Sequence, residues 1–329
     1  MGQAWELLTR SVPAFGGERF LNLTDAMARW LFALAVVCAL RSAAVRGGSP
    51  PLPALALQVA LDRAGFSPGQ IDGRNGHFTS RARDAFIEAR KAPIEPSATP
   101  LTQYTITEAD AAGPFVEQIP SDIEEQAKLQ ALAYTSVVEA LAERFHASPA
   151  LLKELNTGAS FTAGATISVP AVDPFMLPTG QGERPKSSGN NGARTASIEL
   201  SRETQAIVVR DASGGVLFYA PVTVGSEQDP LPVGDWKVTR VFDLPVFNYN
   251  PELFWDADPG HAKATIPAGP NNPVGVVWIG IDKEHFGFHG TPEPSQIGRT
   301  ESHGCVRLTN WDAEKLASLV TEGTPVRLR

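Results

Sequence analysis

Cysteine is nearly absent from this chain of 329 residues, which contains only Cys38 and Cys305. Two cysteines exclude a disulfide-rich scaffold and any zinc or iron–sulfur site built from several thiolates of one chain. An excess of basic residues is also lacking, because 28 lysines and arginines stand against 36 aspartates and glutamates, a net charge of −8. Nucleic-acid binding needs a basic footprint, so the composition argues against it.

An apolar stretch long enough to span a membrane is missing near the N-terminus. The run Trp30–Leu40 is unbroken but short, whereas a spanning helix needs roughly 20 apolar residues. Arg29 precedes the run, and the small residues Ser42 and Ala44 follow it. This order is typical of a cleaved export signal and predicts no stable membrane span.

We therefore expect residues 1–46 to be a signal-peptide region, with the true translation start at Met27 and the mature protein in the periplasm or cell envelope. A buried helix or an uncleaved anchor is the alternative. Cleavage after Ala44 would remove Cys38 and leave Cys305 as the one thiol of the exported protein. An odd cysteine in an oxidising compartment is a candidate reactive thiol.

The chain is also rich in turn-forming residues, with 29 glycines and 27 prolines, and this predicts several domains joined by linkers. In residues 50–92, a helical repeat ends at Gly65, a tight turn follows at Ile71-Asp72-Gly73, and Thr79 is the expected N-cap of a second helix. The pattern resembles the small peptidoglycan-binding module found beside cell-wall enzymes. The matching residues are Leu57, Gln58, Leu61, Gly65, Phe66, Ile71, Asp72, Gly73, Gly76, Thr79, Ala82 and Phe86.

A second small module is expected in residues 103–172. A helix over Val137–Phe145 is followed by a second helix that starts at Ser148-Pro149, and then by a strand over Ala165–Val169. This order resembles a LysM glycan-binding module with its first strand at Tyr104–Thr107. An acidic insertion separates that strand from the helices, which departs from the family pattern and leaves glycan binding open.

A linker at 173–194 leads into a mainly β domain over 195–329. Strand-like alternation and turn signals dominate there, and only Asp312–Val320 has a helical pattern, with Ala313, Leu316, Ala317 and Val320 on one face. The predicted strands are Ser197–Leu200, Ala206–Asp211, Val216–Val224, Gly234–Thr239, Val274–Ile281 and Pro325–Leu328.

The chemistry concentrates between Phe286 and Leu308, where Cys305 lies close to two histidines. A thiol near its ordinary pKa is only a few per cent thiolate at neutral pH, so a catalytic thiol needs a base to take its proton. His303 is two residues away, and His289 can approach from a neighbouring strand. Gly304 lets the backbone come close to a substrate carbonyl, and the amides of Gly304 and Cys305 could form an oxyanion hole.

This segment resembles the L,D-transpeptidase (YkuD-type) catalytic domain, in which a distal histidine precedes Ser/Thr-His-Gly-Cys, an apolar residue and Arg or Asn. The resemblance covers roughly residues 196–329 and implies a YkuD-type β-sandwich. It implies that Cys305 is the nucleophile, His289 the proton acceptor and His303 a residue that orients the thiol loop. The expected substrate-binding residues are Arg307, Ser302 and Gly290, although a structural salt bridge is an equal alternative for Arg307.

By the same resemblance, the thiol attacks a peptidoglycan stem peptide, D-alanine leaves and a thioester forms. The partners are then peptidoglycan stem peptides and glycan, the acyl acceptor is an amine of another stem or of a wall-anchored protein, and neither cofactor nor metal is implied. Water as acceptor would make the chain an L,D-carboxypeptidase. A wall-binding protein with an inactive catalytic domain is the non-enzymatic alternative.

Other chemical interpretations of the same residues are weaker. A zinc site from His289, His303 and Cys305 lacks a clear fourth ligand, although Asp282 and His285 lie close in sequence. A papain-like peptidase would need its cysteine before its histidine and on a helix.

Apart from His285, three histidines fall outside the cysteine segment. His77 and His146 belong to the N-terminal modules and are expected at the surface. The loop around His261 could form a lid over the site, and its role stays open.

Overall fold

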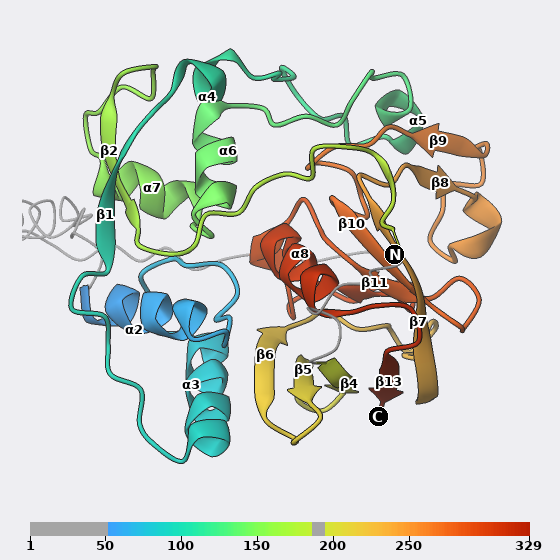
Figure 1. Ribbon diagram of the computed structural model, residues 1–329. Helices are drawn as coiled ribbons and strands as arrows, with labels where there is room; N and C mark the ends of the chain where they lie inside the picture. The colour runs from blue at the N-terminus through green and yellow to red at the C-terminus, as the bar shows by residue number, and fades with distance from the viewer. Residues whose placement is uncertain (1–51, 186–194) are drawn as a thin grey trace, which may run out of the picture. The chain divides into compact units, whose positions relative to one another are not determined.

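The computed structural model describes residues 52–185 and 195–329 (Figure 1). The expected export signal in residues 1–46, with Met27 and Cys38, lies outside the described residues, as do residues 186–194 of the linker. In the part of the chain that is described, no helix combines the length and the apolar character needed to cross a bilayer.

The first described element is a helical hairpin of α2 (Leu52–Arg63) and α3 (His77–Arg90). Gln58 of α2 holds the intervening turn, because its Nε2 donates to Asp72 Oδ1 at 2.9 Å and its Oε1 accepts from Gly73 N at 2.9 Å. Thr79 is not the N-cap of α3. It is the third residue of that helix, whose N-cap is Gly76, and its hydroxyl accepts from Gln58 Nε2 at 3.2 Å. That this hairpin binds peptidoglycan remains a prediction.

The next part of the chain pairs two strands across four short helices. Strand β1 (Leu101–Thr105) runs antiparallel to β2 (Thr166–Pro170) and begins three residues before the predicted strand. Side-chain caps start the helices between them: Thr107 caps the first, and Ser148 accepts from Leu151 N at 3.0 Å. The helices are α4 (Glu108–Ala112), α5 (Ile123–Gln126), α6 (Val137–Arg144) and α7 (Pro149–Leu155).

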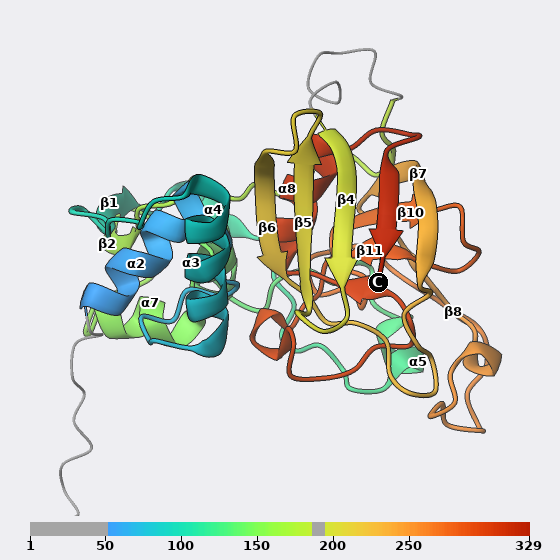
Figure 2. The same ribbon diagram turned by 90° about the horizontal axis from the view of Figure 1, so that it is seen from below.

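The C-terminal part is mainly β, as predicted, but its strands belong to one curled sheet of nine strands (Figures 1 and 2). The order is β12-β11-β10-β7-β13-β4-β5-β6, with β3 paired to β7. The strands are β3 (Gly182–Glu183), β4 (Thr195–Ser201), β5 (Ala206–Asp211), β6 (Val216–Pro221), β7 (Gly234–Asp243), β10 (Val277–Ile281), β11 (Gly287–His289), β12 (Val306–Arg307) and β13 (Pro325–Leu328).

The two sheets of the predicted sandwich form one continuous sheet, because β7 is long enough to pair with strands of both halves. Its first residues, Gly234–Lys237, pair with β13, and the following residues pair with β10. The helix α8 (Asn310–Leu319) lies against the inner face of this sheet and buries Ala313, Leu316 and Ala317 in the core. Thr309 caps α8 by accepting from Asp312 N at 3.1 Å, so the helix starts two residues before the predicted position.

The structure also contains a separate two-stranded hairpin, whose strands were not predicted from the sequence. It consists of β8 (Phe247–Tyr249), the 3-10 turn η2 (Pro251–Leu253) and β9 (Ala264–Ile266). Tyr249 and Ile266 pack with Leu132 in a small apolar cluster that also includes residues of α5. The acidic insertion between β1 and α6 therefore supports this hairpin.

Buried polar contacts join the N-terminal elements to α8. His146 Nδ1 lies 2.8 Å from Asp62 Oδ2, and the His146 ring stacks on Trp311 at 5.2 Å between centroids. Ser67 Oγ donates to Asp312 Oδ2 at 2.9 Å. The prediction of a surface position for His146 is therefore wrong, since the ring packs between elements, whereas His77 is exposed as predicted.

Candidate active site

The pairing of β11 with β12 brings the predicted catalytic residues close together. The strands are parallel, with Phe288 level with Val306 and His289 level with Arg307. Phe288 and Val306 point into the core. Because side chains alternate along a strand, His289 and Arg307 project from the opposite face. Cys305 directly precedes β12.

The Cys305 thiol lies over the start of β11. Its Sγ accepts a hydrogen bond from the backbone N–H of Gly287 and lies 3.4 Å from the carbonyl oxygen of His285. Burial raises the pKa of this thiol to about 11, although the Gly287 amide and the Arg307 charge act in the opposite direction. The resting group is therefore a neutral thiol.

His289 is held on two sides. Its side chain stacks on Trp278 of β10, with ring centroids 5.6 Å apart and an angle of 11° between the planes, and the residue is 4% exposed. Its Nδ1 lies 2.7 Å from the carbonyl oxygen of Gly290, so Nδ1 must carry the proton and Nε2 is the free acceptor. Burial first, and the Arg307 charge second, lower the pKa of His289 to about 3.

The turn that carries the thiol is fixed by its neighbours. Ser302, which is 3% exposed, donates from Oγ to the carbonyl oxygen of Cys305 at 2.5 Å. Gly304 has a φ of +98°, and a Cβ there would meet the Phe286 ring at 2.6 Å. Only glycine fits this conformation and this close approach, so the position of the Gly304 and Cys305 amides is built into the loop.

His303 faces the β8–β9 hairpin. Its Nε2 lies 2.7 Å from Asp256 Oδ1, and its ring contacts those of Phe254 and Trp255, with centroids 4.8 and 5.9 Å away. At the base of the same hairpin, His261 Nδ1 lies 3.2 Å from the Tyr249 hydroxyl. The loop that was expected to form a lid therefore touches the thiol loop through His303.

The three residues predicted to bind substrate all have partners within the protein. Arg307 donates from Nη1 to the carbonyl oxygen of Glu301 at 3.3 Å. Gly290 is buried, and a Cβ there would meet Asn310 Oδ1 at 2.1 Å. Ser302 bonds to the thiol loop as described above. Substrate contacts by these residues remain predictions.

Two neighbours of His289 and His303 were not predicted from the sequence. Trp278 looks like one more apolar residue of a buried strand, and only the pairing with His289 reveals its position on the outer face. Asp256 stands in a loop that the sequence marked as a lid, but nothing in the sequence pairs it with His303. Both contacts join residues from different elements, which local patterns do not encode.

The donor geometry needed for the zinc alternative is not present in the described ranges. Among residues 52–185 and 195–329, no three histidine, cysteine, aspartate or glutamate side chains lie close enough together to hold a metal ion. Asp282 accepts from Lys237 N at 2.8 Å, and the His285 side chain is largely exposed.

Comparisons with known proteins converge on one family. Residues 195–328 match the family model of the L,D-transpeptidase catalytic domain, YkuD. A Bacillus subtilis relative that carries the name L,D-transpeptidase YkuD is 26% identical over 194 residues, which is 58% of this chain and 92% of the relative. An Escherichia coli relative with the name L,D-transpeptidase ErfK/SrfK is 32% identical over 134 residues, 37% of this chain and 43% of the relative.

Solved structures of L,D-transpeptidases are also similar, but weakly. One from Mycobacterium smegmatis shares 17% identity with a TM-score of 0.34, and the match covers 52% of this chain and 76% of that one. An Enterococcus faecium L,D-transpeptidase shares 19% identity with a TM-score of 0.32 over 41% of this chain and 50% of that one.

Proposed function

We propose that the chain transfers acyl groups between peptidoglycan stem peptides through a thioester on Cys305; the match of residues 195–328 to the L,D-transpeptidase catalytic domain, YkuD, supports this. The single observation that supports the proposal is the pairing of β11 with β12, which places Cys305, directly before β12, against Gly287 of the strand that ends at His289. The tautomer of His289 supports it, because Nε2 is left free to accept a proton.

In the acylation step, the thiol proton passes to His289 Nε2 as Sγ bonds to the carbonyl carbon of the third residue of a stem tetrapeptide. The Gly304 and Cys305 amides face the resulting oxyanion. The carbon–nitrogen bond to D-alanine then breaks, and the imidazolium returns its proton to the leaving amine. The products are a thioester on Cys305 and free D-alanine.

The low pKa of His289 and the high pKa of Cys305 indicate the timing of this transfer. An imidazolium–thiolate pair is not stable in the resting site, so the proton moves as the substrate carbonyl arrives. Arg307 lowers the cost of the developing thiolate through its positive charge. Its role in this step is electrostatic. Arg307 can hold a substrate carboxylate only after its Nη1 leaves the carbonyl oxygen of Glu301.

In the second step, an amine attacks the thioester. His289 Nε2 accepts the amine proton, the carbon–sulfur bond breaks, and the thiolate recovers the proton from the imidazolium. With an amine of a second stem the product is a cross-link, with a wall-anchored protein it is an attachment, and with water the reaction is an L,D-carboxypeptidation.

His303 acts through its position. Its bond to Asp256 ties the thiol loop to the β8–β9 hairpin, which would cover a bound stem peptide. Gly290 holds the proton on Nδ1 of His289, and Ser302 fixes the carbonyl of Cys305. We treat these three residues as positioning groups around Cys305.

The N-terminal elements extend the proposal to the rest of the chain. The α2–α3 hairpin is a peptidoglycan-binding candidate, and the β1–β2 pair with its helices is a LysM-like candidate for glycan. An export signal in residues 1–46 would deliver both to the periplasm or cell envelope, where the substrate is located.

Release of D-alanine from a stem tetrapeptide tests the proposal. Cys305→Ala should abolish release because no other thiol lies in the described residues. His285→Asn is the matched control, since His285 is exposed in the adjacent loop with φ +65° and asparagine tolerates that conformation. Release by Cys305→Ala at the wild-type rate would refute the nucleophile, and an inactive wild type would favour a wall-binding protein.

A further inference from the structure

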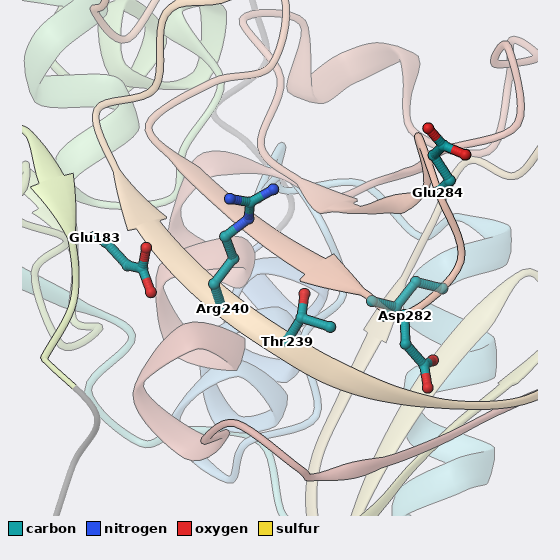
Figure 3. A pocket seen from close by; sticks show the side chains of 6 residues that line it. Glu183, Thr239, Arg240, Asp282 and Glu284 are labelled. Atoms are coloured by element: carbon teal, nitrogen blue, oxygen red, sulfur yellow. The ribbon is translucent and has the colours of Figure 1, made fainter.

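A groove of about 440 Å³ opens beside the active site on the outer face of β7 and β10. Figure 3 shows Arg240 standing up from β7, with Glu183 on one side and the β10–β11 turn carrying Glu284 on the other. Thr239 and Asp282 complete its polar lining. The residues that line the groove were not predicted from the sequence to be catalytic or to bind substrate.

The strand register connects this groove to the thiol. Gly287 donates its N–H to Cys305 Sγ, Gly287 is level with Gly280 on β10, and Gly280 is level with Arg240 on β7. Two glycines are therefore all that stand between Cys305 and Arg240 along this row. Adjacent strands lie about 4.8 Å apart, so Arg240 starts about two strand spacings from Gly287 and its long side chain can reach back over the row.

Arg240 is also free to bind a ligand. Within the described residues its guanidinium makes no hydrogen bond and no ion pair, although three carboxylates line the same groove. Arg184, which directly follows the neighbouring strand β3, contrasts with it because it bonds both Asp243 and Glu314. An exposed guanidinium beside a reacting thiol is suited to a carboxylate, which it can bind through two parallel hydrogen bonds.

The mixed charge of the groove further limits the chemical class of ligand that it can bind. A simple carboxylic acid would meet Glu183 and Glu284 as well as Arg240 and would be repelled by them. An amino acid brings an ammonium group with its carboxylate, and the acidic side chains then attract it. The groove therefore fits the carboxylate of an amino acid whose nitrogen, as an ammonium group or as an amide N–H, faces the acidic side chains.

We propose that Arg240 binds the α-carboxylate of the amino acid that reacts at the carbonyl carbon. In the first step this is the leaving amino acid, whose nitrogen is joined to that carbon. In the second step it is the acceptor, whose nitrogen attacks the thioester on Cys305. This inference rests on the proposed function and deepens it. The leaving D-alanine carries such a carboxylate a few bonds from the scissile carbon, and so does the amino-acid centre of a diamino-acid side chain from another stem. A protein lysine side chain and water carry none at that distance. The site thus favours stem-peptide acceptors over the other two.

The test compares two donors that differ only in this carboxylate: a stem tetrapeptide ending in D-alanine and the same peptide ending in D-alaninamide. For Arg240→Ala, kcat/KM for the acid donor should fall about 10- to 100-fold, the loss expected for one charge-assisted contact. The amide donor should be used equally slowly by wild type and variant. Arg240→Lys should recover part of the loss with the acid donor.

The acceptor half of the reaction is measured separately, by transfer of the acyl group to a free D-amino acid and to its amide. Arg240→Ala should lose the preference for the acid over the amide, and Glu284→Gln should raise the KM of the amino-acid acceptor a few-fold by removing a carboxylate that attracts the ammonium. Arg202→Ala is the matched control, because Arg202 is exposed at the β4–β5 turn, far along the sheet from Cys305.

The outcomes separate this inference from the proposed function. Equal losses with acid and amide donors would overturn a carboxylate site at Arg240 and would indicate a structural role. An unchanged Arg240→Ala enzyme would overturn it as well. If wild type releases neither D-alanine from the acid donor nor D-alaninamide from the amide donor while iodoacetamide still alkylates Cys305, the proposed function itself fails.

Discussion

His289 and His303 flank the same thiol, but His289 belongs to the sheet and His303 to a loop held by a neighbouring hairpin. His289 is buried, stacks on Trp278 and has its tautomer set by the Gly290 carbonyl. His303 is partly exposed and bonds Asp256 of the β8–β9 hairpin, which packs on the acidic insertion. The proposed proton acceptor therefore belongs to the sheet, whereas the proposed positioning residue is held by the separate β8–β9 hairpin.

The strongest test of this comparison removes each ring in turn. His289→Ala should lower kcat/KM for D-alanine release by about 10² to 10⁴-fold, the usual contribution of general acid–base catalysis. His303→Ala should cost about tenfold or less, because it removes a positioning contact. Steady-state kinetics with His285→Asn as control checks both, and a larger loss in His303→Ala would exchange the two roles.

The pH profile sharpens the difference between a neutral pair and an ion pair. A histidine with a pKa of about 3 is already a free base at pH 5, and a thiol with a pKa of about 11 is still protonated at pH 9. We therefore expect kcat/KM for acylation to vary little between about pH 5 and 9, whereas alkylation of the free enzyme by iodoacetamide should keep rising through that range. A bell-shaped acylation profile centred near neutrality would contradict the neutral pair.

His146, a third histidine, shows how neighbouring carboxylates change the pKa of a buried imidazole. Desolvation is the largest effect on His146 and lowers its pKa, but Asp62, Asp312 and Asp173 raise it, and the net shift is upward. Burial also raises the pKa of Asp312 to about 7. Both groups favour the protonated form in the fold, so the stability they contribute is present at low pH and is lost as pH rises toward and past 7.

The free energy of unfolding should accordingly fall by about 1–3 kcal/mol between pH 5 and pH 8, as measured by urea denaturation. Asp312→Asn keeps an acceptor for Ser67 Oγ and removes the buried charge, so its stability should depend less on pH. An equal pH dependence in wild type and Asp312→Asn would show that this carboxyl is not the source.

The smallest expected effect on kcat/KM comes from a substitution in the β8–β9 hairpin. Asp256→Asn removes the charge opposite His303, and an exposed ion pair contributes little, about 0.2–1 kcal/mol. We expect kcat/KM for D-alanine release to fall about two- to fivefold, with stability unchanged. Asp258→Asn, in the same exposed loop without a bond to His303, is the control. A loss in Asp256→Asn as large as that in His289→Ala would make the hairpin part of the proton-transfer machinery.

The sequence predicted the parts of this site that lie close together in the chain. The Ser302-to-Arg307 segment and the distal His289 identified the family, and the alternation of apolar residues predicted most strands of the sheet. The β8–β9 hairpin was not predicted because its strands have three residues each and no clear alternation. Trp278, Asp256 and Arg240 could not be predicted because their importance comes from strand register and from contacts between distant elements.

The central claim, a catalytic thiol served by His289, is tested most directly by mass spectrometry of the purified protein after incubation with a carbapenem. The account predicts a covalent adduct that peptide mapping places on Cys305, formed rapidly by wild type and much more slowly by His289→Ala. A protein that stays unmodified, or an adduct on another residue with Cys305 free, would contradict it.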